Sequence, residues 1–258
     1  MKKVIYYFSG TGNNIAVAKS LCEQIQDMEM YPITDLLQVK KIPEEYDLVG
    51  FSVPSYFSHV PPVIPDCIRN LQFADHQKVF SVIGCGGNRG HATEDVRELV
   101  EACGRRVNYE YMVIFPGSYI LSYNAFPQWY QNPVLHHSKN KIRKIARQLM
   151  TAGADHKLGK GLFYNAGNEK ALQAAISKYS QMGLAYTVSD ECTKCRRCMQ
   201  ICPVKNISME NGEVTFGTHC QQCMACIQWC PNRAIDYQGA AKDRTRYHHP
   251  DITVKDMI

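Results

Sequence analysis

Eight of the chain's twelve cysteines lie in two short stretches with the same spacing. The first reads CTKCRRCMQICP from Cys192 to Pro203, and the second reads CQQCMACIQWCP from Cys220 to Pro231. Both follow the pattern C-x2-C-x2-C-x3-C-P. At this spacing three thiolates can converge on one side of a short turn, while the fourth, carried on a following helix, points elsewhere. The proline after the fourth cysteine releases the chain from helix geometry.

Groups of four thiolates hold iron–sulfur clusters or zinc. Zinc ribbons space their ligands as two separated C-x2-C pairs, whereas each stretch here puts three cysteines in seven residues and a fourth before a proline. The spacing therefore favours two 4Fe-4S clusters, with a pair of tetrahedral zinc sites as the alternative.

This part of the chain resembles two-cluster bacterial ferredoxins, in which the fourth cysteine of each motif ligates the other cluster. The resemblance implies two crossed ligand sets. One consists of Cys192, Cys195, Cys198 and Cys230, and the other of Cys220, Cys223, Cys226 and Cys202. Between the motifs, Asn211 and Gly212 predict the turn of a small hairpin.

Composition and charge exclude several classes of protein. The 258 residues carry a formal net charge of +5 without a basic block, so we expect no nucleic-acid binding. No run of about eighteen apolar residues occurs, and we expect no membrane span. The apolar run after Lys3 is about five residues long, too short for a signal peptide. We expect a cytoplasmic protein, whose reducing surroundings disfavour a disulfide framework.

The first 150 or so residues alternate apolar runs with amphipathic stretches, as in an α/β protein with a doubly wound parallel sheet. Strands are predicted at 3–8, 29–33, 47–53, 78–84 and 108–115, and helices at 13–25, 61–73, 93–104 and 137–150. We expect an α/β domain over 1–152, a helical connector over 153–185, a small α+β two-cluster domain over 186–238 and a tail over 239–258.

The stretch FSGTGNN, residues 8–14, joins the first predicted strand to the first helix and is suited to binding an anion. A Walker loop needs G-K-(S/T), which is lacking. A dinucleotide fingerprint fits at Gly10 and Gly12, but Ile15 replaces its third glycine; Asp35 supplies the acidic residue about twenty positions on. A loop for a phosphate monoester, rich in hydroxyls, and a plain strand–helix turn are the other interpretations.

This loop resembles that of flavodoxin, (S/T)-x-T-G-x-T, which wraps the phosphate of FMN, although Asn14 stands in place of the last threonine. In such sheets FMN lies at the carboxyl ends of the strands, where PSYFSHVPP and GCGGNRGH follow the next two central strands. The resemblance implies FMN binding by Ser9, Gly10, Thr11, Gly12, Asn13, Asn14, Pro54, Ser55, Tyr56, Phe57, Gly84, Cys85, Gly86, Gly87, Asn88, Arg89 and Gly90.

Other residues allow two interpretations each. Arg89 either favours anionic reduced flavin or is a solvated surface residue, and Cys85 either touches the flavin ring or packs. The aromatic stretch 116–135 either packs the two domains together or lines a substrate site. We expect Cys22, Cys67 and Cys103 to be buried and unreactive, and His248 and His249 to form a surface or capping pair.

The combination resembles the flavodoxin–ferredoxin fusion electron-transfer proteins of anaerobic bacteria. The resemblance implies an electron carrier that links two 4Fe-4S clusters, a bound FMN and an unidentified redox partner, and that needs no acid or base residue. The alternative is a flavin-dependent reductase of a small acceptor, such as a quinone or a nitroaromatic compound, fed through the clusters. The direction of flow and the oligomeric state are left open.

Overall fold

The computed structural model describes residues 2–151, 153–159 and 178–258. Contacts divide the chain into two compact units. The first contains the chain up to Phe8, then Asn14–Pro116 and the segment that begins at Gln128. The second contains Ser9–Asn13, Gly117–Pro127 and the C-terminal part of the chain to Ile258. The short segments 9–13 and 117–127 therefore pack with the cysteine-rich part of the chain.

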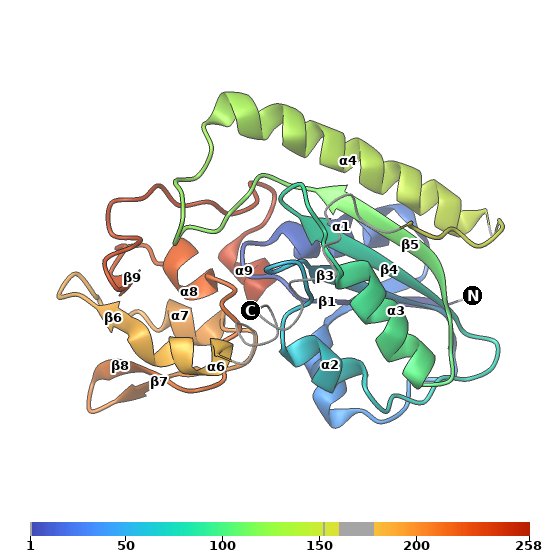
Figure 1. Ribbon diagram of the computed structural model, residues 1–258, viewed down its shortest axis with the longest axis horizontal. Helices are drawn as coiled ribbons and strands as arrows, with labels where there is room; N and C mark the ends of the chain where they lie inside the picture. Colours follow the sequence, from blue (N-terminus) through green and yellow to red (C-terminus); the bar gives the residue numbers. More distant parts are fainter. Residues whose placement is uncertain (1, 152, 160–177) are drawn as a thin grey trace. The chain divides into compact units, whose positions relative to one another are not determined.

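The first unit is built on a five-stranded parallel sheet (Figure 1). Its strands are β1 (Lys2–Tyr7), β2 (Met28–Pro32), β3 (Tyr46–Pro54), β4 (Lys78–Cys85) and β5 (Val107–Ile114). They lie in the order β2-β1-β3-β4-β5, and every neighbouring pair is parallel. This is the flavodoxin-like strand order, so the α/β fold predicted from the alternating pattern is confirmed.

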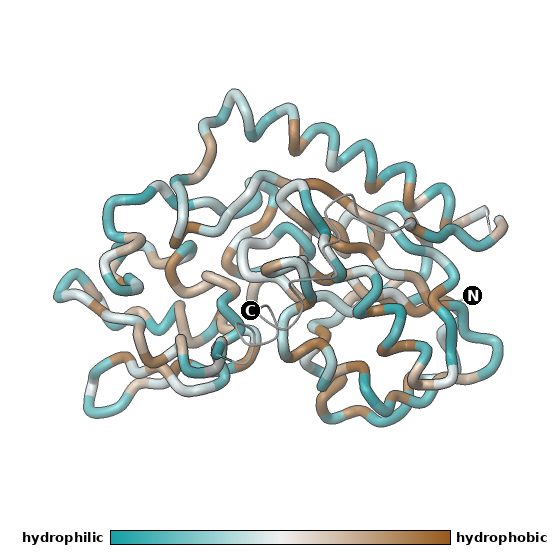
Figure 2. The backbone as a smooth tube through the Cα atoms, in the orientation of Figure 1, coloured by the Kyte–Doolittle hydropathy of each residue, from teal (hydrophilic) through white to brown (hydrophobic). Residues whose placement is uncertain are grey.

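Helices cover both faces of the sheet. The helices α1 (Asn13–Gln24) and α4 (Gln128–Met150) share one core with the side chains of Ile5, Val82 and Tyr111. The helices α2 (Val63–Ile68) and α3 (Ala92–Ala102) lie on the opposite face, and a 3-10 helix, η1 (Ile33–Gln38), follows β2 (Figure 1). Figure 2 shows the hydrophobic stretches concentrated along the strands. Apolar runs buried between two helix layers are expected of a parallel sheet.

The prediction for α4 was too short at its N-terminus. The helix begins at Gln128, nine residues before the predicted start, and includes Pro133. Proline removes a backbone N–H and normally marks a helix boundary, which explains why the sequence pattern indicated a later start. Downstream of Pro133, Ser138 Oγ donates to the carbonyls of Val134 and Ile114, which fixes the helix to the end of β5.

The second unit consists of short elements. Two antiparallel pairs, β6 (Tyr186–Val188) with β9 (Ile235–Tyr237) and β7 (Ile207–Glu210) with β8 (Glu213–Phe216), flank the short helices α7 (Arg197–Gln200) and α8 (Ala225–Gln228). The helix α6 (Tyr179–Met182) and the 3-10 helix η3 (Gly183–Ala185) precede β6, and α9 (Val254–Met257) ends the chain. The predicted connector falls mostly on 160–177, outside the described residues.

Among the described residues of this unit, one hydrophobic cluster packs beside the cysteines. Its buried members are Ile120, Tyr186, Met224, Ile227, Ile235 and Ala241, with five partly buried aliphatic or aromatic side chains and four cysteines packed against them. None of the helices in the described part of the chain has the length and apolar character needed to cross a bilayer.

A buried ion pair joins α3 to the sheet. Glu110 of β5 is fully buried and accepts from Arg97 Nε at 2.7 Å, from Arg97 Nη2 at 2.8 Å and from the Leu158 N–H at 2.9 Å. Burial by itself would raise the pKa of Glu110, but the bonds from Arg97 and Leu158 and the charge of Lys157 outweigh it and hold that pKa below its ordinary value. The ionised carboxylate therefore stabilises the fold.

Replacing Glu110 by Gln should lower the free energy of unfolding of the sheet at pH 7 by about 2–4 kcal/mol, because Arg97 then lacks its charged partner. Amide hydrogen exchange in β4 and β5, followed by mass spectrometry, measures this opening. The matched control is Glu98→Gln, which changes an exposed carboxylate on the same helix and should shift the stability by less than about 0.5 kcal/mol.

The pH dependence tests the charge itself. Because the folded pKa is depressed, the contribution of Glu110 is complete above its unfolded pKa of about 4.3 and is lost as the pH falls through the folded value. The difference between wild type and Glu110→Gln should therefore shrink below about pH 4.3. A difference that stays constant with pH would contradict the assignment.

Candidate functional site

The two cysteine stretches build the same backbone twice. Each contains three non-glycine residues with positive φ at equivalent places: Lys194, Arg196 and Lys205 in the first, and Gln222, Met224 and Arg233 in the second. Arg196 and Met224 precede α7 and α8 with nearly equal left-handed angles. Such conformations cost about 1–3 kcal/mol each and gather at functional sites, so their repetition indicates two equivalent ligand-binding turns.

Backbone N–H groups in these turns point at sulfur. Asn206 N–H donates to Cys202 Sγ, and Ala234 N–H donates to Cys230 Sγ, each at 3.3 Å. In both cases the donor lies four positions after the fourth cysteine of its stretch. Gln222 N–H donates to Cys220 Sγ at 3.4 Å. Hydrogen bonds of this kind stabilise thiolates and adjust the potentials of iron–sulfur clusters.

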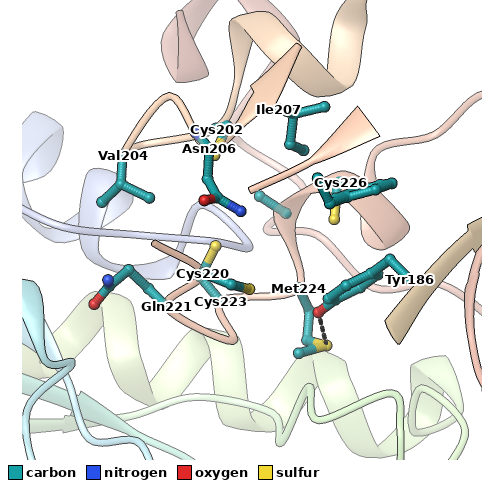
Figure 3. Close-up of a pocket in the computed structure, with 12 residues that line it drawn as sticks. Tyr186, Cys202, Val204, Asn206, Ile207, Cys220, Gln221, Cys223, Met224 and Cys226 are labelled. Atoms are coloured by element: carbon teal, nitrogen blue, oxygen red, sulfur yellow. Dashed lines mark hydrogen bonds between the residues drawn. The ribbon is translucent and has the colours of Figure 1, made fainter. Parts of the chain in front are cut away.

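One pocket contains a complete set of four predicted ligands. Cys202 of the first stretch lines it together with Cys220, Cys223 and Cys226 of the second (Figure 3). Its remaining walls are mainly apolar and include Tyr186, Ile207 and Phe216. The fourth cysteine of one stretch thus faces the first three of the other, as the resemblance to two-cluster ferredoxins implies.

Electrostatic coupling groups the thiols in the same way. Burial raises the pKa of Cys198 to about 11, and the charges of Cys195, Cys230 and Cys192 add to the shift. Burial also raises the pKa of Cys226 well above its ordinary value, helped first by Cys223, Cys220 and Cys202. These thiols are therefore protonated when no metal is bound, and metal binding has to release their protons.

No three His, Cys, Asp or Glu side chains within the described ranges could hold a single metal ion. The four thiols instead surround a shared pocket (Figure 3). A multi-iron cluster would lie within such a pocket, bound by the four thiolates around it.

Arg246 provides an independent test of whether the residues fit a cluster. Its Nη1 donates to the Ala241 carbonyl at 2.8 Å, but its Nε and Nη2 are buried and have no hydrogen-bond partner among the described residues. Burial lowers the pKa of Arg246 and Arg233 adds to this, while the charges of Cys230 and Cys226 oppose it. The charge of Asp236 opposes it as well. Two buried donors on a guanidinium that is influenced by cysteines of both predicted ligand sets fit the neighbourhood of a cluster.

The loops after β3 and β4 are bonded to one another in the first unit. In the β3 loop (residues 54–62), Ser55 N–H and Oγ donate to the carbonyls of Gly84 and Arg89, both at 2.9 Å. From the β4 loop (residues 84–91), His91 N–H donates to the Ser58 carbonyl at 2.6 Å. Gly90 has a φ of +51°, and a Cβ there would collide with Ser58. The predicted FMN residues of these two loops are therefore brought together.

The predicted FMN residues of these two loops differ in their exposure. Cys85 is buried, and burial raises the pKa of its thiol. Gly86, Gly87 and Asn88 are exposed, and Asn88 Oδ1 accepts from the Gly90 N–H at 2.9 Å. Pro54 ends β3 and is buried, whereas Phe57 is 42% exposed.

Arg89 is not the solvated residue that one interpretation expects. It is 7% exposed, its Nη1 lies 3.1 Å from Glu94 Oε2, and its Nη2 donates to the Gly159 carbonyl. Because Glu94 neutralises the guanidinium, Arg89 adds little net positive charge to the β4 loop.

Asn14 packs differently from the other residues of its loop. Its side chain is buried in the first unit, where Oδ1 accepts from Ser52 Oγ at 3.2 Å and lies where a Cβ on Gly84 would be. Asn14 thus fastens the start of α1 to the ends of β3 and β4. The five residues before it, Ser9–Asn13, form the β1 loop and belong to the second unit.

The β1 loop packs against the cysteine-rich segment. A Cβ on Gly10 would lie 1.9 Å from the carbonyl oxygen of Cys223, so only glycine fits there. Trp229 Nε1 donates to the Gly10 carbonyl at 3.0 Å, and the His249 N–H donates to the Thr11 carbonyl at 2.8 Å. The hydroxyl of Tyr247 donates to Asn13 Oδ1 at 2.8 Å.

These contacts assign a role to the tail, for which no function was predicted. His249 is 7% exposed and so does not lie on the surface, and its Nδ1 accepts from the Asp251 N–H at 3.2 Å. His248 stacks on Trp229 with ring centroids 4.2 Å apart. No motif marks these residues. The apolar or aromatic character of Tyr247 and Ile252 within a polar tail was the one available signal.

The aromatic stretch divides into two parts. Ile120 is buried in the core of the second unit, with Tyr119 and Leu121 packed against it. Gln228 Nε2 donates to the Ser118 carbonyl at 2.9 Å, and Arg244 Nη1 donates to the Ile120 carbonyl at 2.6 Å. Residues 118–121 therefore pack within the second unit. Trp129, in contrast, is 77% exposed.

Comparison with known families supports the cysteine assignment. Residues 185–231 match the family model described as 4Fe-4S dicluster domain. No curated protein sequence matches the chain.

Solved structures resemble the N-terminal part of the chain. An FMN-dependent NADH-azoreductase from Bacillus anthracis in complex with FMN is 11% identical, with a TM-score of 0.41, over 58% of this chain and 99% of that one. A flavodoxin from Streptococcus pneumonia TIGR4 is 11% identical, with a TM-score of 0.40, over 59% and 99%. A flavodoxin from the domain Archaea is 14% identical, with a TM-score of 0.37, over 58% and 99%. All three TM-scores are below 0.5, and the flavodoxin-like fold is identified by the order of the strands.

The β2-β1-β3-β4-β5 sheet and the dicluster match together define the organisation of the molecule. The chain combines an α/β domain of flavodoxin-like strand order with a C-terminal segment that matches a 4Fe-4S dicluster domain.

Proposed function

We propose that the protein is an electron carrier that passes low-potential electrons between two 4Fe-4S clusters and a bound FMN, and to or from a redox protein partner. The observation that carries the proposal is the contact of Gly10 with Cys223 inside one compact unit. It joins the loop with the flavodoxin-like pattern directly to a predicted cluster ligand. Free thiols at all twelve cysteines support a reducing, cytoplasmic setting.

The cysteines would hold the clusters in two crossed sets, Cys192, Cys195, Cys198 and Cys230 for one and Cys220, Cys223, Cys226 and Cys202 for the other. The β1, β3 and β4 loops would hold FMN. When bound, each cluster exchanges one electron and FMN exchanges one or two. The residues of the chain bind these groups, exclude water through Tyr186 and Phe216, and direct N–H donors at sulfur. No side chain has to transfer a proton.

The first experiment tests the cofactors together. Protein prepared anaerobically should contain about eight iron atoms, four for each cluster, and should bind one FMN. Photoreduction should reduce all the centres, and reoxidation should be fast with a one-electron protein acceptor. A colourless protein that contains zinc would refute the proposal. Fast turnover with a quinone or nitroaromatic compound alone would support the reductase instead.

Paired substitutions test the crossing of the ligands. Replacing Cys202 and Cys220 by Ser removes two thiolates from one predicted set, so about four iron atoms should remain. Replacing Cys192 and Cys202 removes one thiolate from each set and should impair both clusters. Iron content and the electron paramagnetic resonance spectrum of the reduced protein distinguish these results. Cys22→Ser on α1 is the control and should leave both unchanged. Equal losses in the two double variants would rule out crossing.

Arg246 should raise the potential of at least one cluster, because a buried positive charge favours the more negative, reduced state. Arg246→Met should lower that potential by roughly 30–60 mV, where 59 mV is a tenfold change for a one-electron couple. Redox titration monitored by electron paramagnetic resonance measures the shift. Arg246→Lys keeps the charge and should lie closer to wild type. Identical potentials in all three proteins would contradict an effect of Arg246 on either cluster.

A further inference from the structure

The β1 loop is held by its carbonyl groups. Gly10 C=O accepts from Trp229 Nε1 at 3.0 Å, and Thr11 C=O accepts from the His249 N–H at 2.8 Å. These two donors come from the end of α8 and from the tail, more than two hundred residues further along the chain. All of these residues belong to the second unit.

These two hydrogen bonds also determine where the N–H groups of the same peptides point. In a trans peptide the C=O and the N–H point to opposite sides, and the described chain contains no cis peptide bond. Because Gly10 C=O is directed at Trp229, the Thr11 N–H of the same peptide is directed away from it. By the same reasoning, the Gly12 N–H is directed away from His249. The contacts thus direct the N–H groups of Thr11 and Gly12 away from Trp229 and His249.

Close packing fixes the same loop at its glycines. A Cβ on Gly10 would lie 1.9 Å from Cys223 O, and a Cβ on Gly12, whose φ is +89°, would lie 3.0 Å from two side-chain carbons of Ile252. The loop is therefore enclosed by a cluster-ligand turn on one side and by the tail on another.

The residues that hold the β1 loop are linked to the predicted cluster ligands through the sequence and through hydrogen bonds. Trp229 directly precedes Cys230, and Gln228 Oε1 accepts from the Tyr247 N–H at 2.7 Å. The hydroxyl of Tyr247 in turn donates to Asn13 Oδ1. Displacement of α8, which carries Cys226, would move both Trp229 and Tyr247 and release the loop.

We propose that Trp229 and Tyr247, with the tail segment 247–252, form a clamp that orients the β1 loop for the phosphate of FMN and couples FMN binding to cluster occupancy. The inference rests on the proposed binding of FMN and deepens it. Trp229 and Tyr247 act as positioning residues, since they act through their hydrogen bonds to the loop. Reciprocity of coupled binding requires that FMN stabilise the clusters by the same factor by which the clusters tighten FMN.

Comparison of FMN with riboflavin isolates the phosphate. In the fully loaded protein, Trp229→Phe keeps the ring and removes its N–H, and it should weaken FMN binding about tenfold, as expected for one lost hydrogen bond. Riboflavin, which lacks the phosphate, should bind wild type and variant equally. Quenching of flavin fluorescence gives both dissociation constants. Trp129→Phe, at an exposed tryptophan, is the matched control and should change neither.

Tyr247→Phe is a second, independent variant in case Trp229→Phe loses iron. It should also weaken FMN relative to riboflavin while about eight iron atoms are retained. Variants that hold their iron and bind FMN as tightly as wild type would overturn the clamp. Equal weakening of FMN and riboflavin would also overturn it. Absence of FMN binding in wild type would instead overturn the proposed function.

Cluster removal tests the coupling. Wild-type protein stripped of iron with a chelator should bind FMN more weakly than the loaded protein, and saturating FMN should slow the loss of iron to the chelator. Riboflavin should protect the clusters less than FMN does. If FMN leaves the rate of iron loss unchanged, the loop and the clusters are not coupled and the inference fails.

Discussion

The contact between the backbones of Gly10 and Cys223 is the constraint on which the C-terminal unit depends. A single added carbon at Gly10 would reach within 1.9 Å of the Cys223 carbonyl oxygen. The turn that carries Cys223 must therefore keep its shape for the β1 loop to keep its own. Since Trp229 and His249 donate to the carbonyls of Gly10 and Thr11, the loop is shaped by residues from the far end of the chain as much as by its own sequence.

Periodicity and spacing predicted the parts of the molecule whose determinants are local. The apolar runs of β3 and β4 are buried on both faces, so their composition alone identifies parallel strands. The cysteine spacing is equally local, and the resemblance to two-cluster ferredoxins that it carries implies the set Cys202, Cys220, Cys223 and Cys226, which lines one pocket. The start of α4 was misplaced because Pro133 is a boundary signal that tertiary packing overrides.

Contacts between distant segments had no sequence signature. Nothing in TRYHHPDI indicates that Tyr247 and His249 bond to a loop near the N-terminus. The bond from His249 joins a backbone N–H to the Thr11 carbonyl and so places no demand on either residue type. The two interpretations of Arg89 could not be separated from the sequence for a related reason. Its burial depends on Glu94 and on a carbonyl seventy residues away, and a single arginine in a glycine loop carries no mark of such partners.

The second unit concentrates backbone strain around its cysteines. Six non-glycine residues there adopt left-handed conformations that cost about 1–3 kcal/mol each. Metal–thiolate bonds can supply folding free energy directly, so binding of the proposed clusters would offset this strain. The turns that bear it are the ones that contact Gly10 and position Trp229. Under the proposed function, the geometry of the β1 loop would therefore depend on whether the clusters are bound.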